Sequence, residues 1–458
     1  MSCVPKAADL GRAKEFMVPA STSSTSQDGA SRKTKIVMLS LLSGAMMFSF
    51  MIRLVLGVAA PKLRQIYDIS PSEMGHLLAG WNWSYTGALP LAGPIVDKFG
   101  PWISMAVGSA IWGLSTMALP LAASFSAIFI MRFAFGIGQG VLIPTTSTSV
   151  SSIFPANERT RAVSVAFTGN AVGLAIGAPV AAMILTRWGW EWIFYIIGGA
   201  SLVLTALWLW LYPNKKIGRV KSPATAAGTD EAPRMSWLSL FRYRSTWGIA
   251  FGQCGYLYAY YFFVSWLPTY LVDARGMTIL KSGFVSSLPF LAGVLGTLAG
   301  GWLGDYLIAR GISPTVSRKS IIGGGLVGST VMVIAAAYIE NVWLAVTLIT
   351  LCVGSLRLAT ASANSLPIDL SPRTVLGSVT SIQNFFGNIG GLLAPIVTGY
   401  MVQSSGGSFI GSLVVAGGMA TFGAISYVFV VGDLDKDRIA PRASVTGGVV
   451  VPSTQAAS

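Results

Sequence analysis

Long apolar stretches alternate with short polar segments between residues 35 and 431. A helix that crosses the roughly 30 Å hydrocarbon core of a bilayer needs about 20 mostly apolar residues. Each stretch of this chain reaches that length, at about 36–59, 74–96, 102–123, 127–153, 163–186, 192–211, 247–271, 283–303, 320–338, 342–366, 375–402 and 410–431. The pattern therefore predicts an all-α membrane protein with twelve transmembrane helices.

One long polar segment divides the twelve stretches into two groups of six. It is basic and rich in Pro, Ala, Gly and Ser, a composition typical of a linker. We expect a cytoplasmic tail at 1–34, a six-helix half at 35–212, a cytoplasmic linker at 213–246, a second six-helix half at 247–432 and a second tail at 433–458. The first tail is Ser/Thr-rich and lacks an apolar core, so we expect disorder there and no cleavable signal peptide.

Composition and charge agree with a membrane location. The chain is 53% hydrophobic and only 10% charged, whereas soluble domains are about 25% charged. The net charge of +14 does not indicate nucleic acid binding, because 23 of the 31 Lys and Arg residues fall in the tails and loops of one face. We therefore expect a multi-pass protein of the plasma (inner) membrane, surrounded by lipid, with both termini in the cytoplasm.

Three arginines lie inside apolar stretches with no acidic residue beside them: Arg53, Arg132 and Arg357. A guanidinium at this depth costs anything from about 2.5 to more than 10 kcal/mol, so such a residue usually faces a cavity and a partner. None of the 17 acidic residues lies in the middle of a predicted helix. Because a guanidinium matches a carboxylate with two parallel hydrogen bonds, we predict that the missing partner is an anionic substrate. For Arg357, bonding to the backbone of a neighbouring helix is the alternative.

Amide and aromatic side chains inside the predicted helices supply further polar groups. Buried amides need hydrogen-bond partners, so we expect such groups to line the substrate cavity. These candidates are Tyr85, Gln139, Tyr258, Tyr261, Gln383, Asn384 and Asn388. The three cysteines are scattered, and the helices hold no cluster of carboxylates or histidines, so we expect no metal, no cofactor and no enzymatic activity.

A short motif recurs at equivalent positions of the two halves. Gly93, Asp97, Lys98 and Gly100 follow the second predicted helix in the run GPIVDKFG, and Asp305 and Arg310 follow the eighth in the run GWLGDYLIARG. We expect a sharp cytoplasmic turn at each place. The repeat resembles the loop typical of the major facilitator superfamily. That resemblance implies two six-helix halves that rock around a central site, with these loops acting in gating.

Further stretches resemble the anion:cation symporter family of that superfamily, which includes bacterial sugar-acid permeases, sialin and vesicular glutamate transporters. They are the runs PANER with GNAVGLAIGAP, GWEWIFYIIGG, YFFVSWLPTYLV and LPIDLSPRTVLGSVTSIQNFFGNIGGLLAPIVTGYMV, within residues 36 to 432. The resemblance implies that Arg53 and Arg132 match two arginines of the family's central polar network. Each lies about six residues, or roughly 9 Å, to the outer side of its helix midpoint. The two arginines can thus flank one anionic site.

Two positions depart from the family pattern. The sugar-acid symporters carry an aspartate and a glutamate where this chain has Ile52 and Gln139. The resemblance therefore does not imply proton symport. Uniport, anion exchange and transport of a substrate that brings its own proton all stay open. Coupling to H+ or to another ion stays open as well. The leading hypothesis is a monomeric secondary active or facilitative transporter of a small organic anion: a carboxylate, including dicarboxylates and sugar acids. An exporter or exchanger of bulkier amphipathic or aromatic anions is the alternative, and a non-transporting receptor or membrane-embedded enzyme the remote one.

Overall fold

The computed structural model describes residues 31–122, 124–213, 237–372, 375–434 and 437. Every regular element in these ranges is helical. The elements are α1 (Arg32–Tyr67), α2 (Pro71–Ala118), η1 (Leu119–Leu121), α3 (Phe125–Gln139), α4 (Leu142–Ile153), α5 (Ala156–Trp188), α6 (Trp190–Leu211), η2 (Trp237–Arg242), α8 (Arg244–Asp273), α9 (Ile279–Ala309), α10 (Pro314–Tyr338), α11 (Val342–Leu370), α12 (Leu376–Ser404), α13 (Ile410–Ile425) and the π-helical η3 (Ser426–Val430).

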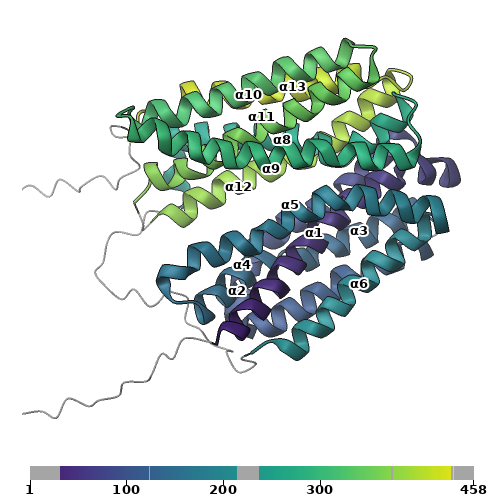
Figure 1. The fold of residues 1–458 in the computed structure, drawn as a ribbon, viewed down its shortest axis with the longest axis horizontal. Coiled ribbons are helices and arrows are strands. Elements are labelled where there is room, and N and C mark those ends of the chain that lie inside the picture. Colours follow the sequence, from purple (N-terminus) through teal and green to yellow (C-terminus); the bar gives the residue numbers. More distant parts are fainter. Residues whose placement is uncertain (1–30, 123, 214–236, 373–374, 435–436, 438–458) are drawn as a thin grey trace, which may run out of the picture.

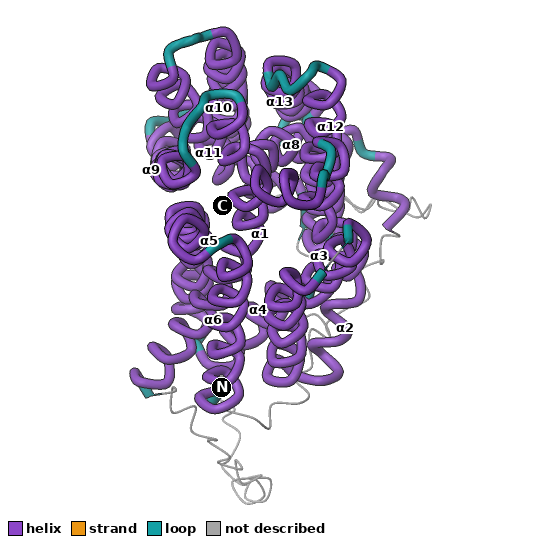
Figure 2. Tube along the Cα trace, turned by 90° about the vertical axis from the view of Figure 1, so that its right-hand side faces the viewer, coloured by secondary structure: helices purple, strands orange, loops and turns teal. Residues whose placement is uncertain are grey.

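The helices form two bundles that lie side by side (Figure 1). In the first half α1 packs on α5, and α2 packs on α3 and α6; in the second half α8 packs on α12, and α11 packs on α9 and α10. Between the halves α1 contacts α8, α2 contacts α12 and α5 contacts α9. Figure 2 shows the same division from the side. The predicted division into six helices and six helices thus describes how the chain packs.

The predicted all-α membrane fold is confirmed. Ten helices of the described residues are long and apolar enough to cross a membrane. One of them, α2, contains two predicted spans, because Gly100 has non-helical dihedral angles (φ 80°, ψ 161°) that only glycine adopts readily. The one remaining span is α8, which is 30 residues long but rich in tyrosine, so its hydropathy is too low to place it among those ten helices. Twelve crossings therefore match the prediction.

Several predicted boundaries are wrong. The outer polar segment after the first predicted span is mostly helical, because α1 continues to Tyr67. The turn expected over GPIVDKFG is confined to Gly100, so Gly93, Asp97 and Lys98 lie in α2. Residues 237–246, predicted as linker, form η2 and the start of α8. The remainder of the linker, at 214–236, and residues 1–30 of the first tail lie outside the described residues. In each case the helix continues through polar residues beyond the apolar stretch from which it was predicted.

The halves touch closely at one end of the bundle. We call the end of the bundle where α1 and α8 begin the basic end. The end where the halves touch is called the opposite end. At the opposite end Arg64 of α1 forms an ion pair with Asp273 of α8 at 2.8 Å, and the Thr269 hydroxyl donates to the Gly57 carbonyl at 3.0 Å. Glycine is required for this approach, since a Cβ on Gly57 would lie 2.5 Å from the Ser265 carbonyl oxygen. The opposite end is therefore closed by direct contact between backbones.

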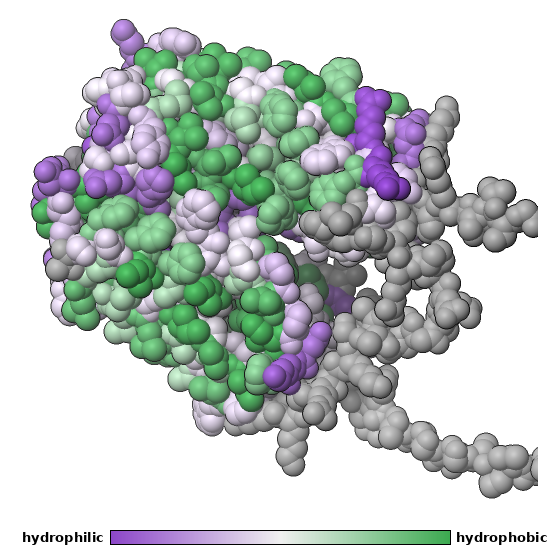
Figure 3. Space-filling model, turned by 180° about the vertical axis from the view of Figure 1, so that it is seen from behind, coloured by the Kyte–Doolittle hydropathy of each residue, from purple (hydrophilic) through white to green (hydrophobic). Residues whose placement is uncertain are grey.

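The two halves separate toward the basic end. A Cβ added at Gly87 or Gly93 of α2 would meet nothing within 4 Å. The space-filling view shows the surface hollowed between the halves, with apolar side chains covering most of the surrounding face (Figure 3). Exposed apolar residues on helices of this length are what a lipid-facing surface requires. The molecule is thus closed at one end and open at the other.

Candidate functional site

Arg53 lies on α1 where the two halves meet, before Arg64 of the closed end. Its side chain is only 6% exposed. The Nε group donates to the Gln139 side-chain oxygen at 2.9 Å, and one terminal nitrogen donates to the Tyr261 hydroxyl at 3.0 Å. Gln139 belongs to the first half and Tyr261 to the second. Arg53 therefore joins three helices (α1, α3 and α8) across the interface between the halves.

Aromatic rings surround the same guanidinium. Its Cζ atom lies 4.3 Å from the ring centroid of Phe50, 4.1 Å from that of Trp81 and 5.3 Å from that of Tyr85. Contact with ring faces stabilises a cation in a desolvated site. A guanidinium has five N–H donors in one plane. Gln139 and Tyr261 each accept from one of them, and the Tyr85 hydroxyl also interacts with the group. The remaining N–H groups leave one edge of the Arg53 fork able to bind an anion.

Gln139 is fully buried and has all its polar groups satisfied. Its oxygen accepts from Arg53, and its nitrogen donates to the Ser49 carbonyl at 3.0 Å and to the Ser49 hydroxyl at 2.7 Å. A neutral amide can do both because it carries an acceptor and a donor. Gln139 therefore fixes Arg53 without adding a negative charge.

A cavity of about 120 Å³ lies beside Arg53. Both halves line it, and no acidic or histidine side chain is among the described residues that do so. Of the predicted site residues it brings together Arg53, Tyr85, Gln139, Tyr261, Asn384 and Asn388; the other lining residues are Met46, Phe50, Leu142, Ile143, Phe167, Asn170 and Leu257. The cavity is thus cationic, with hydroxyl and amide groups around an apolar wall.

Asn170 is a lining residue that sequence reasoning missed. It lies on α5, and its side-chain oxygen is buried without a hydrogen-bond partner among the described residues. A buried acceptor without a partner is costly unless a ligand or water fills the position. The only signal in the sequence is an asparagine within the run GNAVGLAIGAP, and that run served only to support the family resemblance.

Arg132 lies outside the lining of this cavity. It is 2% exposed, and it donates to the carbonyls of Leu77 on α2 and Ile52 on α1, each at 3.4 Å. One terminal nitrogen is buried without a partner. In this conformation Arg132 contacts the backbone directly before Arg53 and so positions α1.

Two other predicted residues, Tyr258 and Gln383, also lie outside the lining. Gln383 donates to the Ala363 carbonyl at 3.0 Å and to the Tyr427 hydroxyl at 3.3 Å, and that hydroxyl donates to Gln253 at 2.7 Å. Tyr258 is buried, 3% exposed. The amide of Gln383 is therefore satisfied inside the second half, away from the cavity.

A further polar contact between the halves, formed by Asn82, was also missed. Asn82 on α2 is 1% exposed and donates to the Asn388 carbonyl on α12 at 2.9 Å. The side chain of Asn388 in turn donates to the Asn384 carbonyl at 2.8 Å. Asn82 thereby fixes the segment of α12 that lines the cavity.

Arg357 lies on α11, outside the cavity lining, and is half-buried. One terminal nitrogen donates to the Tyr256 hydroxyl at 3.1 Å, and its Cζ lies 5.2 Å from the ring centroid of Tyr260. Its hydrogen bond therefore goes to a tyrosine of α8, and the described residues show no bond from Arg357 to a backbone carbonyl of a neighbouring helix.

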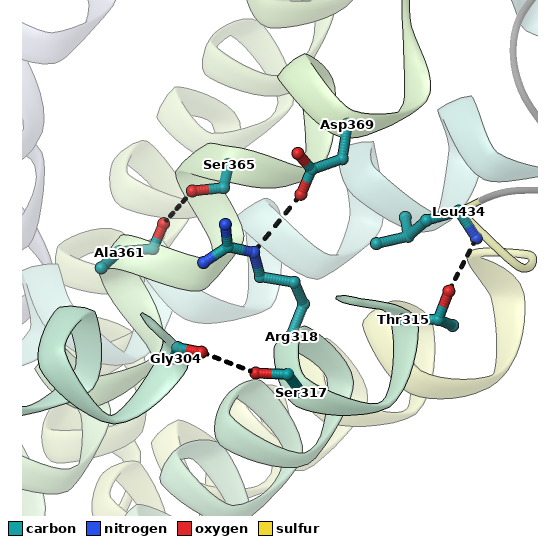
Figure 4. Close-up of polar contacts among 8 residues, drawn as sticks. All are labelled: Gly304, Thr315, Ser317, Arg318, Ala361, Ser365, Asp369 and Leu434. Carbon is teal, nitrogen blue, oxygen red and sulfur yellow. Dashed lines mark hydrogen bonds and ion pairs between the residues drawn. The ribbon is translucent and has the colours of Figure 1, made fainter. Parts of the chain in front are cut away.

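The predicted gating residues lie at the basic end. Asp97 and Asp305 are exposed, and neither forms one of the ion pairs among the described residues. Arg310 covers the Tyr306 ring at 4.5 Å. Nearby, Arg318 pairs with Asp369 at 3.3 Å, and the Ser317 hydroxyl donates to the Gly304 carbonyl (Figure 4). These contacts tie α9, α10 and α11 together within the second half. The gating role of the loops stays a prediction.

Comparison with known proteins identifies relatives with one common activity. Residues 42–395 match the model of the Major Facilitator Superfamily. The chain is 31% identical to a probable galactarate/D-glucarate transporter of Escherichia coli K12 (84% of this chain, 91% of the relative). It is 29% identical to a hexuronate transporter of Bacillus subtilis (86% and 94%). A solved structure of a bacterial homologue of the lysosomal transporter Spinster, inward-facing and unoccupied, matches with a TM-score of 0.76 at 17% identity, over 90% of this chain and all of that one.

Proposed function

The chain belongs to the major facilitator superfamily, and on this premise we propose that it is a secondary transporter of a small hydroxylated carboxylate. The observation that carries the proposal is Arg53, a buried cation with free N–H groups beside a cavity that no acidic side chain lines among the described residues. A carboxylate supplies the missing charge and matches the guanidinium fork. The relatives support the hydroxylated class, because they are named as transporters of sugar acids.

The lining gives each part of such a substrate a partner. Arg53 holds the carboxylate, while Tyr85, Tyr261, Asn384, Asn388 and Asn170 offer hydroxyl and amide groups to the substrate hydroxyls. Arg132 acts as a positioning residue through its contacts with α1 and α2. A cavity of about 120 Å³ is smaller than the roughly 300–1,000 Å³ of pockets for drug-sized ligands. The volume favours a compact ion over a bulky amphipathic one.

The contacts between the halves support alternating access. The basic end faces the cytoplasm by the distribution of Lys and Arg, so the closed end is the outer one and the hollow opens inward. Helices α1 and α8 carry both the Arg53–Tyr261 contact of the site and the Arg64–Asp273 pair of the closed end. A substrate that competes with Tyr261 for Arg53 would therefore loosen the seam that holds the outer end closed.

Uptake into proteoliposomes tests this function. We expect a radiolabelled six-carbon sugar acid to enter vesicles that contain the protein, and its uncharged parent sugar to remain outside. Runs with imposed pH and voltage gradients measure coupling in the same vesicles. Uptake of the sugar or of organic cations, with none of the acids, would overturn the proposal.

Gln139→Glu should create a pH dependence that the native site lacks. The glutamate side chain would accept a hydrogen bond from Arg53 as the amide does. When ionised, it would compete with the substrate carboxylate for Arg53. It would also face the Ser49 carbonyl without a donor. Protonation removes that charge and restores a donor to Ser49. Uptake by Gln139→Glu should thus fall as the pH rises through the carboxyl's pKa and recover on acidification, relative to the native protein.

The matched control for this substitution is Gln403→Glu on α12 at the opposite end, which adds the same charge away from the cavity and contacts the backbone N–H of Ser72. Its pH profile should follow that of the native protein. A Gln139→Glu profile parallel to both would show that residue 139 does not control the charge on Arg53.

A further inference from the structure

Arg357 is a half-buried intramembrane cation that the site around Arg53 does not use. None of the three ion pairs among the described residues includes it. Among the described residues its guanidinium forms one hydrogen bond, to the Tyr256 hydroxyl. An arginine in a membrane span without a counter-charge is costly and usually marks a substrate pathway.

The unused N–H groups of Arg357 face open space. In the part of the chain that the structure describes, one terminal nitrogen of Arg132 is buried without a partner, whereas no atom of Arg357 is in that state. The Arg357 side chain passes Gly293 of α9, whose added Cβ would lie 3.0 Å from its Cγ, and ends at Tyr256 and Tyr260 of α8. Because α8 lies among α1, α9, α11, α12 and α13, the guanidinium points toward the interior of the protein and away from lipid.

A row of tyrosines on α8 connects this second guanidinium to the first. Tyr261 binds Arg53, and Tyr256 binds Arg357. Between them Tyr260 meets the Tyr261 ring edge to face at 5.8 Å and stacks on the Tyr256 ring at 6.3 Å. The two attachment points are five residues apart, about 7.5 Å along the helix axis. They also lie on different faces of α8, because five residues turn a helix by about 140° beyond one full turn. A ligand that reaches both guanidiniums therefore has to be extended and to carry an anionic group at each end.

We propose that Arg357, held by Tyr256 and Tyr260, is a second anion subsite, and that the transporter selects open-chain polyhydroxy dicarboxylates over monocarboxylates. The proposal rests on the proposed function, since it assigns the far end of a substrate whose near carboxylate binds Arg53. A monocarboxylate leaves one of the two guanidiniums without a counter-charge, whereas a dicarboxylate neutralises both. The second carboxylate also bridges α1 of one half to α11 of the other, so a diacid draws the halves together at the basic end.

Binding to the purified full-length protein tests this selectivity. Isothermal titration gives the Kd of a six-carbon sugar diacid and of the matching sugar monoacid for the native protein and for Arg357→Gln. We expect the native protein to bind the diacid at least about tenfold more tightly. Arg357→Gln should weaken diacid binding by about 10- to 100-fold, the range of one charged hydrogen-bonded contact, and change monoacid binding by less than about threefold.

Two further variants separate a binding role from a structural one. Tyr256→Phe removes the hydroxyl that positions Arg357, and it should lower the diacid preference by a smaller factor without affecting the monoacid. Arg187→Gln removes an exposed arginine at the end of α5 and should leave both affinities unchanged. Thermal unfolding of each variant checks that it folds, and Arg357→Lys, which keeps the charge, should retain part of the preference.

The outcomes distinguish this inference from the proposed function. Equal weakening of both acids in Arg357→Gln, or an unchanged diacid preference, would overturn the second subsite while leaving anion transport intact. Failure of the native protein to bind either acid would overturn the proposed function itself. Native affinities that are equal for the two acids would also contradict the proposed selectivity.

Discussion

Arg53→Ala should reduce sugar-acid uptake by at least about 100-fold. The substitution removes the charge and the donor fork that face the cavity, and each charged hydrogen bond contributes about 1.5–3 kcal/mol, so two of them correspond to about 10²- to 10⁴-fold. It also leaves the Gln139 oxygen and the Tyr261 hydroxyl without their shared donor. Initial rates of uptake into proteoliposomes, normalised to the amount of inserted protein, measure the effect.

Two variants keep this prediction falsifiable. Arg187→Ala removes an exposed arginine at the end of α5 and should transport at the native rate. Arg53→Lys retains the charge but loses the planar fork, so its rate should lie between those of the native protein and Arg53→Ala. If Arg53→Ala folds, inserts and transports like Arg187→Ala, then Arg53 does not bind the substrate.

Gly75→Val should block transport by preventing closure of the opposite end. A Cβ at Gly75 of α2 would lie 2.5 Å from the Pro395 carbonyl oxygen of α12, and neither backbone can move away without separating the halves. Overpacking costs about 1–3 kcal/mol, and this cost falls only on the conformation in which the two helices touch. We expect uptake to drop by more than about tenfold, with the protein held open at that end.

The chain offers a matched control on the same helix. Gly87 of α2 is exposed, and an added Cβ there meets nothing within 4 Å, so Gly87→Val should transport normally. A cysteine placed at Ser72 reports access at the opposite end through its reaction with an impermeant thiol reagent. Gly75→Val should raise that reactivity and Gly87→Val should not; equal reactivity and equal transport would contradict a closing contact at Gly75.

The sequence predicted the spans and the two halves because apolar length is a local property. It failed at helix ends, where tertiary contacts decide. α1 continues through polar residues as far as Tyr67, because Arg64 finds Asp273 on the other half. The turn is limited to Gly100 because a single residue with positive φ is enough to redirect the chain. The polar residues before it can stay helical because they lie outside the bilayer core.

The candidate site was predictable only where the residue type itself carried the signal. A charge in an apolar stretch marked Arg53, and the structure places it beside the cavity with six predicted residues in the lining. Packing decides which face of a helix points to the cavity, so the sequence did not distinguish Arg53 from Arg132. The N–H groups of Arg132 donate to backbone carbonyls instead. Asn170 was missed for the same reason, because an amide among small residues has no visible partner until α5 is packed against α1.

Substrate recognition depends on one contact, a substrate carboxylate bound to Arg53. A thermodynamic cycle measures the energy of this contact most directly. The Kd values of a sugar acid and of its neutral primary amide are determined for the native protein and for Arg53→Gln. The native protein should prefer the acid by at least about tenfold, and Arg53→Gln should lose that preference, which gives a coupling of about 1.4 kcal/mol or more between the two groups. A native preference for the acid that survives unchanged in folded Arg53→Gln would contradict the account.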